Sequence, residues 1–369
     1  MRKGWEYKKL GEVCDVYQPK TLSTDMLSKD GEYPVYGANG IIGYYHQYNH
    51  EDKEVLLTCR GATCGNINVS KPYSWINGNA MVIHRKSEFI DFDFLKYMML
   101  SLDYSLIITG AAQPQITRQK LAPIKIAIPP KSTQLAIVSE LDKINELIRL
   151  KKEQLKDFDN LAQSLFYEMF GDPVENEKGW EVKKLGEIGE VKTGNTPSRS
   201  NDNFYNEKFI EWIKTDNIRN EQMNPTTAAE YLSRDGAECG RIVSKGSILV
   251  ACIAGSLSSI GKCCITTKNV AFNQQINAIT PYGDFCNSIY LYELIRNSYK
   301  YIQQNATTGM KHILSKSIFE KMKFPLPPLS LQRLFAQRIE QIEREKSEVQ
   351  KSIQDLETLL ASRMQYWFE

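Results

Sequence analysis

The sequence has few of the residue groupings that build catalytic or metal centres. Its eight cysteines contain no C-x-x-C pair, and only Cys59 and Cys64 have a spacing that could serve a metal. A structural zinc site needs four clustered ligands, so we expect reduced thiols that pack as small apolar side chains. The four histidines are scattered along the chain: His46, His50, His84 and His312. We therefore expect no metal and no cofactor.

Long apolar runs and phosphate-binding loops are also missing. No apolar run approaches the roughly 18 to 20 residues of a membrane span, and the first residues have no apolar stretch typical of a signal peptide, so we expect a cytoplasmic protein. No G-x-G-x-x-G follows a strand, and no G-x-x-x-x-G-K-[ST] loop exists. The segment "NPTT" at Asn224 to Thr227 lacks the second proline and the aromatic of an amino-methyltransferase loop.

One acidic grouping has the spacing of a nuclease site. Asp172 with Glu181 and Lys183 fits a carboxylate followed by E-x-K. The corresponding Glu6 and Lys8 near the N-terminus have no comparable acidic residue ahead of them, and the Asp172 set lies in a linker. This comparison disfavours a nuclease site, and the chain shows no catalytic apparatus.

Charge does not identify a partner by itself. The 369 residues carry a formal net charge of +2, with 42% hydrophobic and 24% charged residues, which is ordinary for a globular protein. Residues 1–130 carry 15 basic and 13 acidic groups, and residues 172–325 carry 19 and 17. A protein that binds DNA alone usually has a larger basic excess, so a partner is expected to share any phosphate contact.

An internal repeat divides the chain. "GWEYKKLGE" at Gly4 to Glu12 returns as "GWEVKKLGE" at Gly179 to Glu187, and "IPPKSTQLAIVSELDKI" from Ile128 matches "LPPLSLQRLFAQRIEQI" from Leu326. The offsets are 175 and 198 residues (179 minus 4, 326 minus 128), so the second copy is 23 residues longer between these anchors. The ends of each half are retained and the middle varies. Most of the extra length lies early in each half, between Tyr17 and Lys53 in the first half and between Lys192 and Gly246 in the second. We expect the repeated entry motif to be structural.

Each half predicts a mixed α/β globule. "EVLLTCRG" and "SILVACIAG" are expected to be buried strands that lead into small-residue turns, and "NGNAMVI" and "NQQINAI" the next strands. "DFLKYMMLSL" and "SIYLYELIRNS" have helical spacing, and "IKIAIPP" and "MKFPLPP" predict short strands that end at a proline pair. The segment "GDPVENEKGW" between the halves predicts a linker.

A long helix is predicted after each globule. Apolar residues alternate at spacings of four and three over about five heptads per helix, a pattern typical of a coiled coil. Lys151 interrupts the first stripe, and Lys346 and Arg363 interrupt the second. Two such helices in one chain are expected to pair antiparallel, with the core lysines fixing the register. The alternative is that each helix packs on its own globule. The core positions are Leu141, Ile144, Ile148, Leu155, Phe158, Ile339, Ile342, Val349, Ile353 and Leu356.

The whole chain resembles one family. The repeated "GWExKKLGE", "GAAQPQIT" at Gly110 to Thr117, "VKTGNTPS" at Val191 to Ser198, and the "IPPKSTQ" and "LPPLSLQ" junctions are similar to the specificity subunit of type I restriction-modification enzymes. The resemblance departs at Thr308 to Ser315, where "TGMKHILS" replaces the "GAAQPQIT" form. The order of globule, helix, globule and helix is more specific than any single motif.

The resemblance implies a function without catalysis. It implies target recognition domains at residues 1–130 and 172–328, each recognising one half of a split sequence in double-stranded DNA, and spacer helices at 131–171 and 329–369. It also implies that the helices dock two adenine methyltransferase subunits, and indirectly a motor and nuclease subunit. The alternatives are a coiled-coil interaction scaffold that never binds DNA, and a single-chain enzyme with an unrecognised site.

Candidate DNA-contacting residues come from the turns and variable loops. Arg and Lys suit guanine edges, Asn and Gln suit adenine, and Ser, Thr and Tyr suit phosphates. For each candidate, a solvated or fold-stabilising role is the alternative. The candidates are Tyr44, Arg60, Gln113, Gln115 and Arg118 in the first half, and Lys192, Asn195, Arg199, Asn217, Arg219, Ser256 and Lys311 in the second.

Overall fold

The computed structural model describes residue 2 and residues 4–110, 113–219, 222–307, 309 and 311–369. The chain divides into two compact units. Unit 1 comprises Met1–Lys152 and Lys351–Glu369, and unit 2 comprises Glu153–Gln350. Each unit therefore contains one globule together with parts of the two long helices.

The main sheet of unit 1 has four antiparallel strands in the order β2-β8-β5-β6. The strands are β2 (Cys14–Tyr17), β5 (Val55–Thr58), β6 (Ile67–Val69) and β8 (Ala80–Arg85). Every side chain of β5 is buried, because β5 lies between two strands and has neighbours on both faces. Helix α2 (Phe92–Ser101) starts at Asp91, whose carboxylate accepts the N–H groups of Asp93 and Phe94.

A second, smaller sheet of unit 1 has the order β4-β3-β7. Strand β3 (Tyr33–Gly37) pairs antiparallel with β4 (Gly40–Tyr45) and parallel with β7 (Trp75–Ile76). Strand β1 (Glu6–Lys9) pairs with β9 (Lys125–Ile128), and the short helices α1 (Leu10–Val13) and α3 (Arg118–Leu121) lie next to them in the chain.

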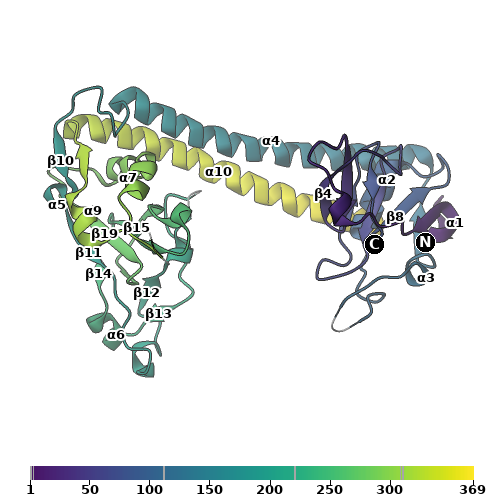
Figure 1. The fold of residues 1–369 in the computed structure, drawn as a ribbon, viewed down its shortest axis with the longest axis horizontal. Coiled ribbons are helices and arrows are strands. Elements are labelled where there is room, and N and C mark those ends of the chain that lie inside the picture. The colour runs from purple at the N-terminus through teal and green to yellow at the C-terminus, as the bar shows by residue number, and fades with distance from the viewer. Residues whose placement is uncertain (1, 3, 111–112, 220–221, 308, 310) are drawn as a thin grey trace. The chain divides into compact units, whose positions relative to one another are not determined.

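Unit 2 repeats this architecture with additions (Figure 1). Its main sheet has the order β11-β19-β15-β17, its second sheet β13-β12-β18-β14, and β10 pairs with β21. As in unit 1, the second sheet contains one parallel pair, formed here by β12 and β18. The main-sheet strands are β11 (Gly189–Thr193), β15 (Ile248–Ala251), β17 (Cys263–Ile265) and β19 (Ile276–Pro281). The others are β10 (Val182–Lys184), β12 (Ile210–Ile213), β13 (Tyr231–Leu232), β14 (Ile242–Val243), β16 (Ile253–Ala254), β18 (Val270–Phe272), β20 (His312–Ile313) and β21 (Lys323–Pro325).

The helices of unit 2 include two with direct counterparts in unit 1. Helix α7 (Ser288–Asn297) corresponds to α2, and α5 (Leu185–Ile188) to α1. Helix α6 (Arg234–Cys239) and strand β14 occur in the longer variable segment of unit 2 and have no counterpart among the described elements of unit 1. Figure 1 shows α6 at the end of unit 2 remote from α7. The remaining short helices are α8 (Tyr299–Gln304) and α9 (Lys316–Lys321). The predicted mixed α/β character is confirmed.

Two helices of 40 residues follow the globules, α4 (Lys131–Phe170) and α10 (Leu329–Phe368). Within unit 1, Arg363 and Trp367 of α10 bond Glu140 of α4, and Lys152 bonds Glu357 at 2.8 Å. Within unit 2, Lys346 of α10 bonds Asp159 of α4 at 3.0 Å. In unit 2, Arg338 of α10 also contacts the Met169 sulfur of α4 at 3.9 Å. In each unit the α10 partner number thus falls as the α4 number rises, so the contacting segments run in opposite directions.

The predicted apolar stripes face inward. Seven of the ten predicted core positions are buried: Leu141, Ile144, Ile148, Ile339, Ile342, Val349 and Ile353. Leu155, Phe158 and Leu356 are half-buried. Lys346, which interrupts the stripe of α10, is itself 5% exposed and has Asp159 and Glu343 as partners. The buried ammonium is thus satisfied by two carboxylates, as a charge at this depth requires.

Candidate nucleic-acid interface

The repeated glutamine of the "IPPKSTQ" and "LPPLSLQ" junctions fastens each globule to its long helix. Gln134 is fully buried; its Oε1 accepts the N–H of Asp91 at 2.7 Å, and its Nε2 donates to the carbonyls of Phe89 and Pro129. This amide therefore holds the N-terminus of α2 against the first turn of α4.

Unit 2 repeats the arrangement with the same atoms. Gln332 Oε1 accepts the N–H of Asn287 at 2.9 Å, and its Nε2 donates to the carbonyls of Phe285 and Pro327. Each buried amide thus satisfies one backbone N–H and two backbone carbonyl groups, as polar groups away from water require. The repeated motif is evident in the sequence, but this role of its glutamine is not.

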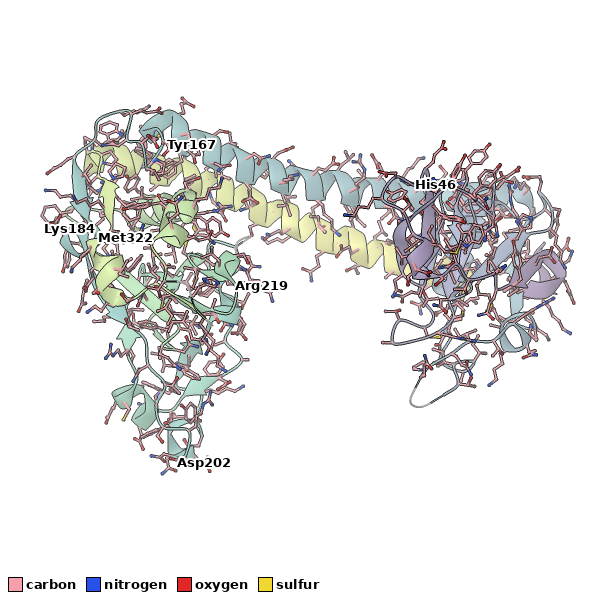
Figure 2. The ribbon with its side chains drawn as sticks, in the orientation of Figure 1. His46, Tyr167, Lys184, Asp202, Arg219 and Met322 are labelled. Atoms are coloured by element: carbon pink, nitrogen blue, oxygen red, sulfur yellow. The ribbon has the colours of Figure 1, made fainter. Side chains whose placement is uncertain are left out.

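The repeated entry motif forms contacts that stabilise the fold. The backbone N–H of Lys9 donates to Glu12 at 3.0 Å, and that of Lys184 donates to Glu187 at 2.8 Å, so each "KKLGE" caps a short helix. Leu10 and Leu185 are fully buried. The Leu185 N–H donates to the carbonyl of Met322, which lies beside Lys184 in Figure 2.

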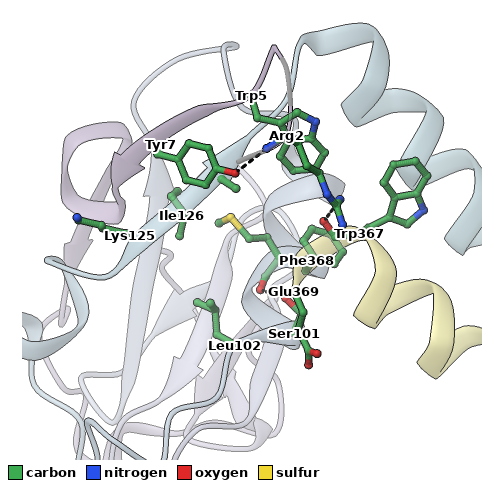
Figure 3. Close-up of a pocket in the computed structure, with 12 residues that line it drawn as sticks. Arg2, Trp5, Tyr7, Ser101, Leu102, Lys125, Ile126, Trp367, Phe368 and Glu369 are labelled. Atoms are coloured by element: carbon green, nitrogen blue, oxygen red, sulfur yellow. Dashed lines mark hydrogen bonds between the residues drawn. The ribbon is translucent and has the colours of Figure 1, made fainter.

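A pocket of about 180 Å³ in unit 1 lies where the entry motif meets the end of α10 (Figure 3). The Arg2 guanidinium donates to the carbonyl of Trp367 at 2.9 Å and lies over the rings of Trp5 and Tyr366. In unit 2 the indole of Trp180 donates to the carbonyl of Phe170, the last residue of α4. These donors occupy the carbonyl groups that a helix leaves unpaired at its C-terminus.

Asp172 stabilises a turn in the linker between the two halves. Its Oδ1 accepts the N–H groups of Val174 and Glu175, and Lys183 pairs with Glu181 at 2.6 Å. The carboxylate that the nuclease spacing requires is thus part of a turn.

Four predicted DNA-contacting residues of unit 1 come from two neighbouring segments. Arg60 and Gln115 are cross-strand partners in an isolated bridge, and the Gly61 N–H donates to the carbonyl of Pro114 at 3.0 Å. Gln113 and Arg118 flank Gln115 on the same segment, and all four side chains are exposed. We call residues 60–61 with 113–118 the unit 1 tip. Ala111 and Ala112 lie outside the described residues.

Gly110 is needed for the backbone path into the unit 1 tip. Its φ is +89°, and a Cβ atom built there would lie 2.4 Å from the carbonyl oxygen of Gln113. A side chain is excluded by both the conformation and the contact.

Tyr44 belongs to a different surface. It lies on β4 in the second sheet of unit 1, with 43% of its surface exposed. Its carbonyl accepts the N–H of Ser28, whereas Arg60 lies in an isolated bridge outside the sheets.

Unit 2 contains a counterpart of the unit 1 tip, made of different residues. β16 pairs with β20, with Ile253 opposite Ile313 and Ala254 opposite His312. Ser256 and Lys311, both exposed, flank these strands, and we call residues 253–256 with 311–313 the unit 2 tip. The Thr307 N–H donates to the carbonyl of Ile313, as Thr109 does to Gln115. "TGMKHILS" and "GAAQPQIT" therefore have the same backbone role in the described residues; Thr308 and Met310 lie outside them.

Asn195 and Asn217 are engaged inside unit 2. The Asn195 amide donates to the carbonyl of Cys239 at 2.8 Å and accepts the Arg241 N–H at 2.7 Å. Asn217 is 7% exposed; it accepts the Lys214 N–H and donates to Thr226 and Thr227. Both amides shape loops, so a base contact by either would break these bonds.

Arg199 is held by a cluster that the sequence analysis did not identify. It donates to Glu230 at 2.6 Å, and its guanidinium lies 4.5 Å from the ring centroid of Tyr205 and 4.8 Å from that of Trp212. Lys214 is paired with the same carboxylate. Although burial raises the pKa of Glu230, its bonds to Lys214 and Arg199 lower it overall. The carboxylate thus stays ionised and keeps both cations fixed.

The other two candidates of unit 2 are accessible. Lys192 on β11 is half-buried and pairs with Glu190 at 3.0 Å. Arg219 is exposed and lies at the edge of unit 2, whereas Asp202 lies at the far end of this unit (Figure 2).

The cysteines are thiols packed in the cores, apart from the half-buried Cys64 and the exposed Cys239. Burial raises the pKa values of Cys14, Cys252 and Cys286 to about 12, so these groups stay protonated. Within the described part of the chain, no three His, Cys, Asp or Glu side chains are grouped to hold a metal ion. In the same residues, no helix has the length and apolarity to cross a membrane.

A family model settles the relationship of the chain. The model of the type I restriction modification DNA specificity domain matches twice, at residues 2–157 and 177–358. The chain belongs to this family. Its two matches correspond to the two repeats and include a large part of the following helices, so each DNA specificity domain extends beyond its globule.

Named relatives in other organisms match part of the chain. The HindI specificity subunit of Haemophilus influenzae is 31% identical over 44% of this chain and 35% of its own length. The EcoprrI specificity subunit of Escherichia coli is 26% identical over 42% and 41%. These two matches span about two fifths of each relative. The MjaVIII specificity subunit of Methanocaldococcus jannaschii is 20% identical over 96% of this chain and 92% of its own.

Two solved structures share the fold. The S subunit of a type I restriction-modification system from M. genitalium covers 99% of this chain with a TM-score of 0.60 at 14% identity. A chain from a structure described as showing complex assembly and conformational transition of the type I R-M system covers 99% with a TM-score of 0.63 at 19% identity. At these identities the likeness supports the fold.

Proposed function

We propose that the chain is the DNA-recognition subunit of a type I restriction-modification complex, acting in the cytoplasm and without catalysis of its own. Unit 1 binds one half of a split DNA target and unit 2 binds the other. The observation that carries this proposal is the pair of tips. The same pattern of backbone hydrogen bonds occurs in both tips, but it presents different exposed side chains. A protein that binds two different half-sites needs that combination of constant frame and variable surface.

The proposal divides the chain into recognition domains at residues 1–130 and 172–328 and spacer helices at 131–171 and 329–369. The spacer helices form an antiparallel coiled coil, and a pseudo-twofold axis relates the two halves. The opposite chain directions of the contacts inside each unit support this arrangement, as does the buried Lys346 at a core position. A single polar residue in such a core specifies register.

DNA contact is assigned first to the exposed candidates. In unit 1 these are the tip residues Arg60, Gln113, Gln115 and Arg118, with Tyr44 as a separate contact from the second sheet. In unit 2 they are Arg199, Arg219, Ser256 and Lys311, together with the half-buried Lys192. Asn195 and Asn217 act by shaping the loops that carry the others. Arginine held by an acidic partner and two aromatic rings is pre-oriented, which reduces the entropy lost when it binds a base or phosphate.

The helices are proposed to dock two adenine methyltransferase subunits and, through them, the motor and nuclease subunits. Leu161 of α4 is 51% exposed and Leu359 of α10 is 45% exposed. These leucines occupy equivalent repeat positions, 198 residues apart (359 minus 161). Two copies of one partner would need two equivalent apolar contacts, and these leucines provide them.

Methylation mapping tests DNA recognition directly. The full chain is co-expressed with its methyltransferase subunit in a host without adenine methylation, and modified adenines are located by single-molecule sequencing. We expect a motif of two short specific parts around a fixed gap. If the two proteins purify together but no sequence-specific methylation appears, the DNA-recognition proposal is wrong and an interaction scaffold remains.

Docking is tested separately with Leu161→Asp and Leu359→Asp. Each variant is expected to release one of the two methyltransferase copies, measured by light scattering after gel filtration. Leu106→Asp is the control, because Leu106 is 88% exposed but lies outside both helices. Retention of both copies by the two helix variants would exclude these leucines from the docking surface.

A further inference from the structure

The two tips share their hydrogen-bond frame position by position. In unit 1 the Cys59 N–H donates to the carbonyl of Asn79, and the Ile116 N–H donates to the carbonyl of Cys59. In unit 2 the Cys252 N–H donates to Gln275, and the Leu314 N–H to Cys252. The frame makes Cys59 equivalent to Cys252 and Ile116 equivalent to Leu314, and these four side chains are all buried.

The next residue on each strand faces the other way, because side chains alternate along extended backbone. Residues 60 and 115 of unit 1 therefore correspond to residues 253 and 313 of unit 2, and both pairs are cross-strand partners. In unit 1 the pair is Arg60 with Gln115, and in unit 2 it is Ile253 with Ile313.

The two pairs have opposite chemistry. Arg60 and Gln115 are exposed, and neither side chain has a hydrogen bond or ion pair with another described residue. Ile253 is half-buried and packs against the hydrophobic core of unit 2, whereas Ile313 is 39% exposed. Identical backbone connections thus present unpaired donors and acceptors in one unit and an apolar surface in the other. The frame does not require an apolar side chain at this position, because the same frame in unit 1 carries Gln115 there.

We propose that this cross-strand pair is a specificity-determining position in both units, with hydrogen-bonding readout in unit 1 and thymine-methyl readout in unit 2. The inference rests on the proposed DNA recognition and extends it to base chemistry. Arg60 suits the O6 and N7 acceptors of guanine, and Gln115 suits the N7 acceptor and N6 donor of adenine. Ile313 has no polar group and fits the C5-methyl of thymine, the one apolar group that a base pair presents in the major groove.

Ile313 also disfavours guanine and cytosine. A guanine or cytosine placed against Ile313 would lose the water that hydrates its polar edge and gain no hydrogen bond. The unit 2 tip therefore selects by exclusion as well as by contact. The Arg60–Gln115 pair selects by the bonds it forms.

The test compares base changes with side-chain changes in the full chain bound to its methyltransferase. Once methylation mapping has given the target, duplexes are made with deoxyuridine in place of each thymine of one half-site, which removes only the methyl group. At one thymine of the unit 2 half-site, we expect the wild-type complex to bind about fourfold more weakly, the effect of losing one buried methyl group. The Ile313→Gln complex should show no such loss at that thymine.

The variants of unit 1 give the complementary result. Arg60→Ala and Gln115→Ala are each expected to relax one position of the unit 1 half-site, with about a tenfold loss on the original target. The unit 2 half-site should be unchanged in the methylation map. Val182→Gln serves as the control for Ile313→Gln, because Val182 is 47% exposed and lies on β10 of the same unit.

Three outcomes overturn the inference: a unit 2 half-site without thymine, an uracil effect that persists in Ile313→Gln, or an unchanged methylation motif in all three tip variants. In each of these, wild-type methylation of a split motif still supports the proposed function. Absence of a split motif in the wild type overturns the proposed function itself. Circular dichroism of each variant, matched to wild type, excludes misfolding as the cause of a loss.

Discussion

Unit 1 and unit 2 share the hydrogen bonds to the backbone that hold their tips and their Gln134 and Gln332 junctions. They differ in the side-chain pairs that connect each globule to the long helices. In unit 1, Tyr97 of α2 donates to Asp142 of α4 at 2.5 Å and accepts from Asn145 at 3.0 Å. The α7 residue at the position of Tyr97 is Glu293, which belongs with Arg296 to a charged cluster instead.

In that cluster, Arg296 and Lys346 share Asp159. At the position of Lys346, unit 1 has Ile148, 198 residues earlier in the repeat (346 minus 198). Backbone-directed bonds are repeated because both globules need the same fold. Side-chain pairs between elements are free to differ as long as every buried polar group has a partner.

The largest expected effect tests whether the frames are equivalent. Gln134→Leu and Gln332→Leu each leave one N–H and two carbonyl groups without their partner in a buried site. Each should lower the free energy of unfolding of its own unit by about 3 kcal/mol or more. Hydrogen exchange followed unit by unit measures this, with the exposed Gln354→Leu as control. A large effect in one unit and none in the other would show that the two glutamines do not have equivalent roles.

The next prediction concerns the charged cluster of unit 2. Lys346→Glu places a third carboxylate beside Asp159 and Glu343, and we expect a loss of about 2 kcal/mol, limited because those carboxylates are about a third exposed. Lys346→Met, which keeps the apolar stem, should lie within about 1 kcal/mol of wild type. Urea denaturation of both variants measures the difference. Equal destabilisation by Met and Glu would show that the ion pairs, rather than repulsion, account for the loss.

The entry motifs should respond equally to loss of their caps. Glu12→Ala and Glu187→Ala each remove one hydrogen bond to the backbone N–H at the start of a short helix, with an expected cost of about 1 kcal/mol. Thermal unfolding gives the values. Glu12→Gln, which keeps an acceptor, should recover most of the loss, and failure to do so would assign the effect to charge.

The smallest effect is a pH dependence confined to unit 1. Hydrogen bonds from Arg363, followed by that from Trp367, lower the pKa of Glu140 below its ordinary value of 4.5 although partial burial raises it. Because the folded-state pKa is the lower one, the stabilisation is present above about pH 4.5 and is lost as the pH falls through the folded-state pKa.

Glu140→Gln should remove that dependence and cost a few tenths of a kcal/mol at neutral pH. Fluorescence of Trp367 between pH 3 and pH 7 reports the contact, because the indole donates to Glu140 at 2.9 Å. An unchanged acid response in the Gln variant would assign the titration to another carboxylate.

Much of the fold was predictable, because it depends on local patterns. The strands at "EVLLTCRG" and "SILVACIAG", the helix after each globule and the inward stripe of Leu141 and Ile339 follow from apolar spacing and from proline and glycine stops. The candidate interface was predictable only in part. The sequence indicates Arg60 and Gln115 only as separate loop residues, and nothing in the 54 residues between them indicates that they are cross-strand partners.

Other candidate residues are engaged in contacts inside the fold that the sequence does not indicate. Asn217 has the composition of a base-contacting residue, but its amide is used by Lys214, Thr226 and Thr227. Glu230 and Trp212, which hold Arg199, could not be selected from sequence because they approach it from separate strands and loops.

The sequence by itself determined the two repeats, the family, the mixed α/β character and the long helices, because each is encoded in residues that are neighbours in the chain or recur at a fixed period. Only the tertiary structure decided which polar side chains remain available for a partner. Availability depends on which donors and acceptors other segments have already used, and those segments meet through folding. In Gln134 and Gln332, backbone groups of the fold use the carbonyl oxygen and the NH2 group of each amide. In Gln115 and Ile313, the same backbone frame leaves two side chains of different chemistry exposed.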